Sequence, residues 1–488
     1  MSTLDSSPQS SASPTASKVN KATLFLVFLT VFIDLLGFGI VLPLLPRYGG
    51  WFNASDAQLG LLMASFSAMQ FLFAPMWGSL SDRMGRRPIL MLGLCGSACS
   101  YTLFGFVSSQ GRDFHFLGLN ALAWLFVTRI GAGIAGATIS TAQAVIADCT
   151  GPENRARGMA LIGAAFGLGF TFGPLIGAVC VSDDVTVRLT PTQWQLIESW
   201  KDQTETVSAQ QFLDQVGAET PLNKASKLAI EQLLTEPKSR SEVAAVLQLP
   251  PSPMPGFVAG GLSAVALLIA AFRLQESRKS NGPAAAGHRA FRPGVMFRHL
   301  SRPSLGVILG AVFITTFGFA QFESTLSLLT QQFGFGTRSN FYLYAYVGVI
   351  LSIGQGVLVR RMLPKIGEHR MALIGVTLMT TGFILIGLAG LEILPGASLW
   401  FILPIVVIGF SSVTPSLQSL LSRSASGDEQ GAVLGTGQSL SSLARILGPA
   451  IGISLMGKSV AFPYFLGATL ILCGGFLVSR IKKTPVGQ

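Results

Sequence analysis

The sequence contains the stretch Gly78-Ser79-Leu80-Ser81-Asp82-Arg83-Met84-Gly85-Arg86-Arg87-Pro88, which joins two apolar segments near residues 58–78 and 88–108. Each segment is long enough to cross a bilayer as a helix, since a span needs about 20 apolar residues. Glycine, proline and several charges are concentrated between them, as expected of a tight turn at a membrane surface. The stretch therefore predicts a pair of membrane helices joined by a charged turn.

The composition indicates a membrane protein over the whole chain. Of its 488 residues, 50% are hydrophobic and 12% are charged, whereas soluble domains carry about 25% charged residues. Apolar runs of spanning length occur twelve times, which predicts an all-α polytopic membrane protein. We place them near residues 22–46, 58–78, 88–108, 119–142, 158–180, 256–272, 303–323, 340–359, 371–391, 397–420, 431–455 and 461–479.

The formal net charge is +11, a basic excess that nucleic-acid-binding proteins also have. Here the Lys and Arg residues lie in short connectors between apolar runs and form no continuous patch, which argues against a nucleic acid as partner. The connectors on the side of the N-terminus carry the whole of the basic excess, and those on the other side are acidic in sum. By the positive-inside rule, both termini are expected in the cytoplasm, with the chain embedded in the lipid of the cell (inner) membrane.

An internal repeat divides the chain. Gly173-Pro174-Leu175-Ile176-Gly177 recurs as Gly448-Pro449-Ala450-Ile451-Gly452, and Gly78-Ser79-Leu80 recurs as Gly356-Val357-Leu358. Helix five thus corresponds to helix eleven, and helix two to helix eight. This predicts two parallel six-helix halves with the substrate cavity between them. We expect an N-terminal half over residues 21–272, a C-terminal half over 303–488, and a disordered tail over 1–20 that is rich in Ser, Thr, Pro and Ala.

Two segments interrupt this pattern. Residues 273–302 join the halves and are rich in arginine, which predicts a basic cytoplasmic linker that serves mainly to orient the chain. Residues 181–253 lie between helices five and six and are expected outside the cytoplasm. Thr190 and Ser208 are suitable N-caps, and Pro221 begins a stretch of helical periodicity, so we expect a few small helices that form a cap. A tolerated insertion is the simpler interpretation of this cap.

The connector over residues 78–88 resembles the signature of the major facilitator superfamily, which has glycine, aspartate, glycine and paired basic residues in the loop after helix two. In this family the glycine lets helix two approach helix eleven, and the aspartate meets a helix N-terminus. A basic residue pairs with an acid at the end of helix four, where Asp148 stands here, and together these groups latch the outward-facing state. The second half has a degenerate copy, with Arg360 in place of the aspartate. The resemblance implies a gating motif of Gly78, Asp82, Arg83, Gly85, Arg86, Arg87 and Asp148.

Helices four and five carry further motifs that resemble those of the family. Arg129 lies in Leu125-Phe126-Val127-Thr128-Arg129-Ile130-Gly131-Ala132-Gly133, which is similar to a fourth-helix motif of arginine followed four residues later by glycine. A charge in mid-membrane is costly and usually functional. In helix five, Gly169, Gly173, Pro174 and Gly177 resemble the antiporter motif. Glycines allow close helix contact and proline permits a bend, although ordinary helix packing is an alternative explanation.

Helix one contains Phe32-Ile33-Asp34-Leu35-Leu36-Gly37-Phe38-Gly39-Ile40-Val41-Leu42-Pro43-Leu44-Leu45-Pro46. It resembles the first helix of tetracycline-exporter-type drug:proton antiporters, which implies that Asp34 faces the cavity. We expect Asp34 to couple transport to protons with the help of Arg129, and Glu323 is a second candidate that we expect near the outer end of helix seven. Tetracycline exporters also carry acids in helices three and nine, where this chain has none. Tetracycline itself is therefore not expected as the substrate.

We expect a monomeric secondary active transporter that exports amphiphilic small molecules or drugs in exchange for protons by alternating access. Uniport or symport of a metabolite is an alternative of the same class. A non-transporting membrane sensor with residues 181–253 as ligand module is an alternative of another class, and the embedded Asp34 and Arg129 argue against it. We expect no enzyme activity, cofactor or metal, because Cys and His lack metal-ligand spacing. Residues 452–459 match the sequence pattern of a phosphate-binding loop. That loop works only between a strand and a helix, whereas these residues lie at the outer end of a membrane helix, so we expect no ATP site there.

Overall fold

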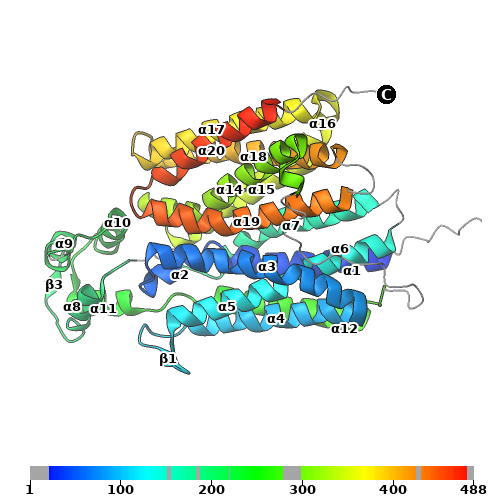
Figure 1. Ribbon diagram of the computed structural model, residues 1–488. Helices are drawn as coiled ribbons and strands as arrows, with labels where there is room; N and C mark the ends of the chain where they lie inside the picture. The colour runs from blue at the N-terminus through cyan, green and yellow to red at the C-terminus, as the bar shows by residue number, and fades with distance from the viewer. Residues whose placement is uncertain are drawn as a thin grey trace, which may run out of the picture.

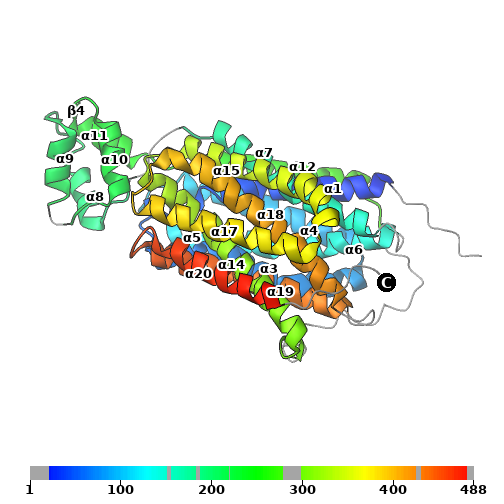
Figure 2. The same ribbon diagram turned by 90° about the horizontal axis from the view of Figure 1, so that it is seen from above.

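The computed structural model describes residues 21–150, 155–182, 187–218, 220–277, 298–424 and 430–480. Twelve helical segments among them are long and apolar enough to cross a membrane, as the sequence predicted, and they run side by side in one bundle (Figure 1). Helix α1 (Lys21–Val41) begins and helix α20 (Phe462–Arg480) ends at the same end of the bundle, which we name the terminal end (Figure 2). The small unit of residues 187–250 projects from the opposite, distal end. The predicted tail over residues 1–20 lies outside the described residues.

The first half consists of six spans, two of which are interrupted or extended by short helices. The first span ends at Val41, earlier than predicted, because Pro43 lacks the N–H group that a helix interior needs; a turn and a short second helix follow. The helices are α1, α2 (Leu45–Trp51), α3 (Asp56–Met84), α4 (Arg86–Ser108), α5 (Ala121–Gly136), α6 (Ile139–Cys149), α7 (Arg155–Val179) and α12 (Met254–Arg273). A small hairpin of β1 (His115–Phe116) and β2 (Leu119–Asn120) joins α4 to α5.

The second half repeats the arrangement of six spans. Its eighth span contains a π-helical turn over Gly354–Val359, a feature often found at functional positions of helices. The helices are α14 (Pro303–Gln332), α15 (Thr337–Ile353), α16 (Arg360–Ile366), α17 (Glu368–Gly390), α18 (Leu399–Arg423), which follows a 3-10 turn at Gly396–Ser398, α19 (Gln430–Met456) and α20. Of the predicted linker over residues 273–302, the part 278–297 lies outside the described residues.

The two halves meet along two pairs of helices. α7 of the first half packs against α15 of the second, and α3 packs against α19. These are helices five and eight, and helices two and eleven. The internal repeat relates five to eleven and two to eight, so each contact is the counterpart of the other. The two-half architecture predicted from the sequence is therefore confirmed in the packing.

The predicted end of helix seven was wrong, and the difference changes where Glu323 lies. We expected helix seven over residues 303–323, which would place Glu323 near the outer end and close to water. The helix runs from Pro303 to Gln332, because polar residues such as Ser324, Ser327 and Thr330 continue it and are buried in the bundle. Glu323 thus lies well inside the helix, and its Oε1 atom is buried.

Residues 187–250, which we name the cap, fold as a small unit of their own. Thr190 and Ser208 each accept a hydrogen bond from the backbone three residues on, as capping boxes that begin helices, in agreement with their predicted role. The elements are α8 (Pro191–Glu198), β3 (Thr206–Val207), α9 (Ala209–Val216), α10 (Lys224–Leu233), β4 (Lys238–Ser239) and α11 (Arg240–Gln248). β3 and β4 pair antiparallel. The cap therefore contains the few small helices that the sequence predicted.

Candidate functional site

Glycines bring the helices of the two halves into close contact. A Cβ atom on Gly60 of α3 would lie 3.0 Å from the backbone of Ala450 in α19. On the other side of the bundle, Gly348 of α15 lies directly against the backbone of Phe170 in α7. Larger residues would push these helices apart, since protein interiors have little free volume. The glycines thus allow the helix backbones of the two halves to approach each other closely, with few side chains between them.

The glycine motif of helix five faces two different neighbours. Gly169 and Gly173 lie against α1, where a Cβ on Gly173 would be 2.9 Å from the Cα of Gly39. Gly177, one turn further on, lies against the ring of Phe341 in α15 of the other half. Helix α7 is therefore held against α1 by one part of the motif and against the second half by another. This geometry suits a helix that seals or bends between two conformations.

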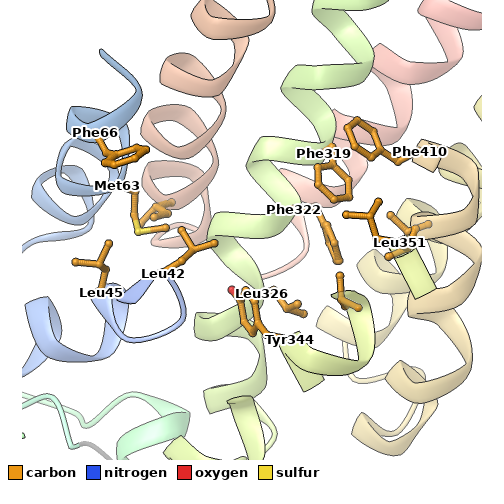
Figure 3. Packing of buried hydrophobic residues seen from close by; sticks show 14 of the residues in the cluster. Leu42, Leu45, Met63, Phe66, Phe319, Phe322, Leu326, Tyr344, Leu351 and Phe410 are labelled. Atoms are coloured by element: carbon orange, nitrogen blue, oxygen red, sulfur yellow. The ribbon is translucent and has the colours of Figure 1, made fainter. Parts of the chain in front are cut away.

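Apolar and aromatic side chains of both halves meet in the middle of the bundle. Figure 3 shows Leu42 and Met63 of the first half on one side and Phe322 of α14 on the other. Phe319 stacks on Phe410 with ring centroids 3.7 Å apart. These residues belong to one hydrophobic core that both halves share.

Asp34 lies in α1 beside polar side chains of α4. Its carboxylate interacts with the Ser97 hydroxyl group and, electrostatically, with Tyr101. The Oδ1 atom of Asp34 is buried and has no hydrogen-bond partner in the described part of the chain. Unpaired buried polar atoms are uncommon in proteins, and each calls for an explanation. Binding of a proton or of a ligand group would supply the missing partner.

Arg129 lies in α5 with 1% of its surface exposed. Its Cζ atom is 4.6 Å from the ring centroid of Phe66 and 5.8 Å from that of Phe38, so the cation rests against two aromatic rings. It also interacts with Tyr101, which faces Asp34. Nε and Nη1 of Arg129 have no hydrogen-bond partner within the described ranges. Asp34 and Arg129 therefore belong to one cluster, joined through Tyr101 and not by a salt bridge.

The second half contains its own embedded acid and base. Glu323 of α14 interacts electrostatically with Arg445 of α19. Tyr344 donates a hydrogen bond to the backbone carbonyl oxygen of Glu323 at 2.6 Å. Each half thus places a carboxylate of its first helix within electrostatic reach of groups on neighbouring helices. No group of three or more possible metal-ligating side chains occurs among the described residues.

The loop between α3 and α4 is held by a network of charges at the terminal end. Arg86 Nη1 lies 2.6 Å from Asp82 Oδ1, and Arg86 Nε lies 3.2 Å from Asp148 Oδ2 at the end of α6. Gly85 has a φ of 104°, a left-handed conformation that glycine adopts without strain. Asp82, Arg86 and Asp148 thus lie together, whereas the Cβ position of Gly78 faces Ser140 of α6 at 4.0 Å and no described residue of helix eleven, unlike the close approach that the resemblance implied.

Sequence reasoning missed one acid of this network. Glu276, just after α12, accepts hydrogen bonds from the backbone N–H groups of Arg86 at 2.9 Å and Arg87 at 3.1 Å. It thereby satisfies two free N–H groups at the start of α4, where the helix dipole favours an anion. Arg87 in turn donates to the carbonyl oxygen of Ala271 at 2.5 Å. The sequence does single out Glu276, because it is the only acidic residue in the basic stretch 273–302.

A polar network at the distal end, also missed from the sequence, joins the halves directly. Arg47 of α2 is 1% exposed and donates from Nη2 to the carbonyl oxygen of Phe335 at 2.9 Å. The Ser327 hydroxyl group donates to the carbonyl oxygen of Pro43 at 2.8 Å, and Asn340 Nδ2 lies 3.4 Å from the same oxygen. We name Pro43, Arg47, Ser327, Thr330, Phe335 and Asn340 the distal gate.

The two ends of the bundle differ in how they are held. At the distal end the gate bonds cross from one half to the other. At the terminal end the pairs Arg86–Asp148 and Arg423–Glu368 each join residues of the same half. Around Gly163 of α7 and Gly356 of the eighth span, no heavy atom of another described segment lies within 4 Å of a Cβ position. The structure is therefore closed at its distal end.

The fold and site are those of a membrane transporter with twelve spans in two pseudo-symmetric halves. The model of the Major Facilitator Superfamily matches residues 27–195 and 245–449, so the chain belongs to this family. The matched ranges leave out most of the cap. The resemblance to the superfamily drawn from residues 78–88 is thus confirmed.

The chain resembles two groups of proteins, major facilitator superfamily domain-containing protein 10 and the tetracycline resistance proteins. The chain is 30% identical to the mouse major facilitator superfamily domain-containing protein 10, covering 91% of this chain and 89% of the relative. It is 27% identical to the class C tetracycline resistance protein of Escherichia coli, covering 93% and 96%. The crystal structure of the human organic anion transporter MFSD10 superposes with a TM-score of 0.60 at 25% identity. The superposition covers 94% of this chain and 99% of that structure.

Proposed function

We propose that the chain is a proton-coupled antiporter that exports amphiphilic small molecules by alternating access. One observation carries the proposal: the Oδ1 atom of Asp34 is buried, has no hydrogen-bond partner among the described residues, and lies in a cluster that also holds Arg129. Of the ionisable groups in this cluster, only the carboxyl group is expected to gain and lose a proton during a transport cycle. The resemblance to tetracycline exporters, which extends over 93% of this chain, supports the same coupling.

Alternating access requires that one end closes while the other opens. In the closed distal end, the gate residues Arg47 and Asn340 join the halves. We assign the opposing role to the loop of residues 78–88. Asp82, Arg86 and Asp148 already pair within the first half in this structure, and we infer that they hold the loop in the shape that contacts the second half in the state open at the distal end. The motif of Gly169, Gly173, Pro174 and Gly177 then keeps α7 close to its two neighbours while the halves tilt.

The termini and the linker are assigned to the cytoplasm, and the cap to the outside. The basic connectors at the terminal end support this orientation, as the positive-inside rule requires. Export then means that substrate enters from the terminal end and leaves through the distal gate. We assign the protein to the cell (inner) membrane as a monomer.

For the substrate, a specific observation favours amphiphilic anions. Within the described part of the chain, two nitrogen atoms of Arg129 have no hydrogen-bond partner, and the guanidinium group rests against Phe38 and Phe66. A guanidinium group beside aromatic rings can bind a carboxylate or sulfonate on an apolar body. The human relative of known structure is named as an organic anion transporter, which agrees with this choice.

The proposal is tested by transport in proteoliposomes with an imposed pH gradient. A panel of anionic, cationic and neutral amphiphiles of similar size should be offered to purified wild-type protein. We expect the gradient to drive uphill movement of anionic members. Movement that ignores the gradient would favour the metabolite facilitator, and movement of no compound at all would favour the sensor.

A further inference from the structure

The cap is a rigid body rather than a loose loop. Its buried side chains form an apolar core of their own, separate from the cores of the bundle. Trp200 and Phe212 at the centre contact each other edge to face, with centroids 5.5 Å apart. Four of its helices begin with a side-chain N-cap. A unit with its own core moves as a whole, so its contacts with the bundle decide what it follows.

The cap is attached firmly to the first half. Arg188 Nη1 lies 3.0 Å from Asp56 Oδ1 at the start of α3, and Arg188 Nη2 donates to the carbonyl oxygen of Ala54 at 2.7 Å. Arg112 of the first half lies over the rings of both Trp51 and Trp194, the latter from the cap. Both chain connections of the cap also lead into this half, to α7 and α12.

The cap also contacts the second half, where α10 packs against α14 and the ion pair is more exposed than that of Arg188. Lys224 Nζ lies 2.6 Å from Glu392 Oε1, with side chains 44% and 60% exposed. Gln232 Nε2 donates to the carbonyl oxygen of Gly334 at 3.4 Å. Between cap and bundle remains a cavity of about 360 Å³, lined among others by Trp51 of the first half and Thr337 of the second. Exposed ion pairs of this kind form and break easily.

We propose that the cap is a strap across the distal gate. It travels with the first half, and its Lys224–Glu392 and Gln232–Gly334 contacts hold the second half against it while the gate is closed. Gly334 and Phe335 are adjacent, so Gln232 of the cap and Arg47 of the gate donate hydrogen bonds to the same turn after α14. Opening of the distal end therefore requires release of the cap from the second half but not from the first. This inference rests on the alternating access of the proposed function.

Chemical cross-linking separates the two attachments. In a background lacking the five native cysteines, the pair Lys224→Cys and Glu392→Cys ties the cap to the second half. The matched pair Arg188→Cys and Asp56→Cys ties it to the first. A short, reducible methanethiosulfonate linker is used, because the long native side chains bridge backbones too far apart for a direct disulfide. A further substitution, Ser327→Cys in the gate, reports opening by its reaction with an impermeant maleimide.

We expect the first cross-link to abolish labelling of Ser327→Cys and to restore it on reduction, while the second leaves labelling unchanged. Labelling that persists with the cap tied to the second half would overturn the strap. Loss of labelling with the cap tied to the first half would show that the cap does not travel with it. If Ser327→Cys fails to react even without cross-linker, the gate does not open and alternating access itself is contradicted.

A charge swap tests the same contact without a cross-link. Lys224→Glu should speed labelling of Ser327→Cys about two- to five-fold, as loss of an exposed ion pair implies. The double variant Lys224→Glu with Glu392→Lys should return the rate to that of the parent. An unchanged rate in the single variant, or a double variant that labels as fast as the single one, would contradict the role of this pair.

Discussion

Arg47 of α2 donates a hydrogen bond from Nη2 to the carbonyl oxygen of Phe335, 2.9 Å away, and so joins the two halves at the distal end. The Nη2 atom also lies 3.4 Å from Thr330 Oγ1, whose hydroxyl group donates to Asn340 Oδ1 at 2.7 Å. Buried hydrogen bonds to a charged group contribute about 1.5–3 kcal/mol each, more than neutral ones. The network therefore has the strength to set the balance between a closed and an open distal end.

We predict that Arg47→Ala shifts this balance toward the state open at the distal end. Loss of about 1–3 kcal/mol corresponds to roughly a 5- to 150-fold change in the equilibrium. The measurement is the rate at which Ser327→Cys reacts with an impermeant maleimide, which should rise accordingly. Lys201→Ala in the cap, whose ion pair with Glu198 is exposed, is the matched control and should change nothing. Equal rates for Arg47→Ala and its parent would rule out a gating role.

We predict the opposite shift for Asp82→Asn at the terminal end. The substitution removes the charge that pairs with Arg86 at 2.6 Å while keeping the shape of the side chain. Transport should slow several-fold with normal membrane insertion, because an interaction of about 0.3–2 kcal/mol biases a conformational equilibrium without unfolding the protein. Initial transport rates at matched expression are compared. Glu276→Gln should slow transport as well, and wild-type rates in both variants would count against the latch.

Helix five offers a matched pair of glycine substitutions. We predict that Gly173→Ala severely reduces transport, since its new methyl group would lie 2.9 Å from the Cα atom of Gly39 in α1. Gly163→Ala in the same helix should be tolerated, because no heavy atom from the other described segments lies within 4 Å of that Cβ position. Both changes raise helix propensity equally, so a difference between them reports packing against α1. Similar activity of the two variants would show that the close contact is not needed.

The topology predicts where the cap is accessible. A single cysteine at Lys201→Cys, in a background lacking native cysteines, should react with an impermeant maleimide in intact cells, since Lys201 is 53% exposed in the cap. Reaction that begins only after lysis would reverse the orientation assigned from the basic connectors.

The twelve spans and two halves could be predicted because bilayer thickness and internal repetition are written directly in the apolar runs and glycine motifs. The loop around Arg86 was equally accessible, since its residues lie close together in the sequence. The distal gate was not, because Arg47 and Phe335 lie 288 positions apart in the sequence and come together only in the folded bundle. Even the length of helix seven was underestimated: Ser327 and Thr330 look like the end of a span, yet both are buried.

The last prediction concerns the coupling of transport to protons, which we assign to Asp34. Among the described residues, neither its buried Oδ1 atom nor Oε1 of Glu323 has a hydrogen-bond partner, but Glu323 has the cation of Arg445 within electrostatic reach. We therefore predict that Asp34→Asn binds substrate but no longer moves it uphill, because an amide cannot exchange a proton. Arg129→Ala should also lose uphill transport, since it removes the cation that interacts with Tyr101 beside Asp34.

The measurements are substrate accumulation in proteoliposomes with an imposed pH gradient and, separately, substrate binding in detergent without one. Glu323→Gln is the matched control, because it neutralises the other embedded acid and should retain the response to the gradient. If Asp34→Asn accumulates substrate at the wild-type rate while Glu323→Gln does not, the coupling group is Glu323. If both variants respond like the wild type, neither acid carries the proton. A wild-type protein that transports equally well with and without the gradient is a facilitator, and Asp34 then serves only to bind the substrate.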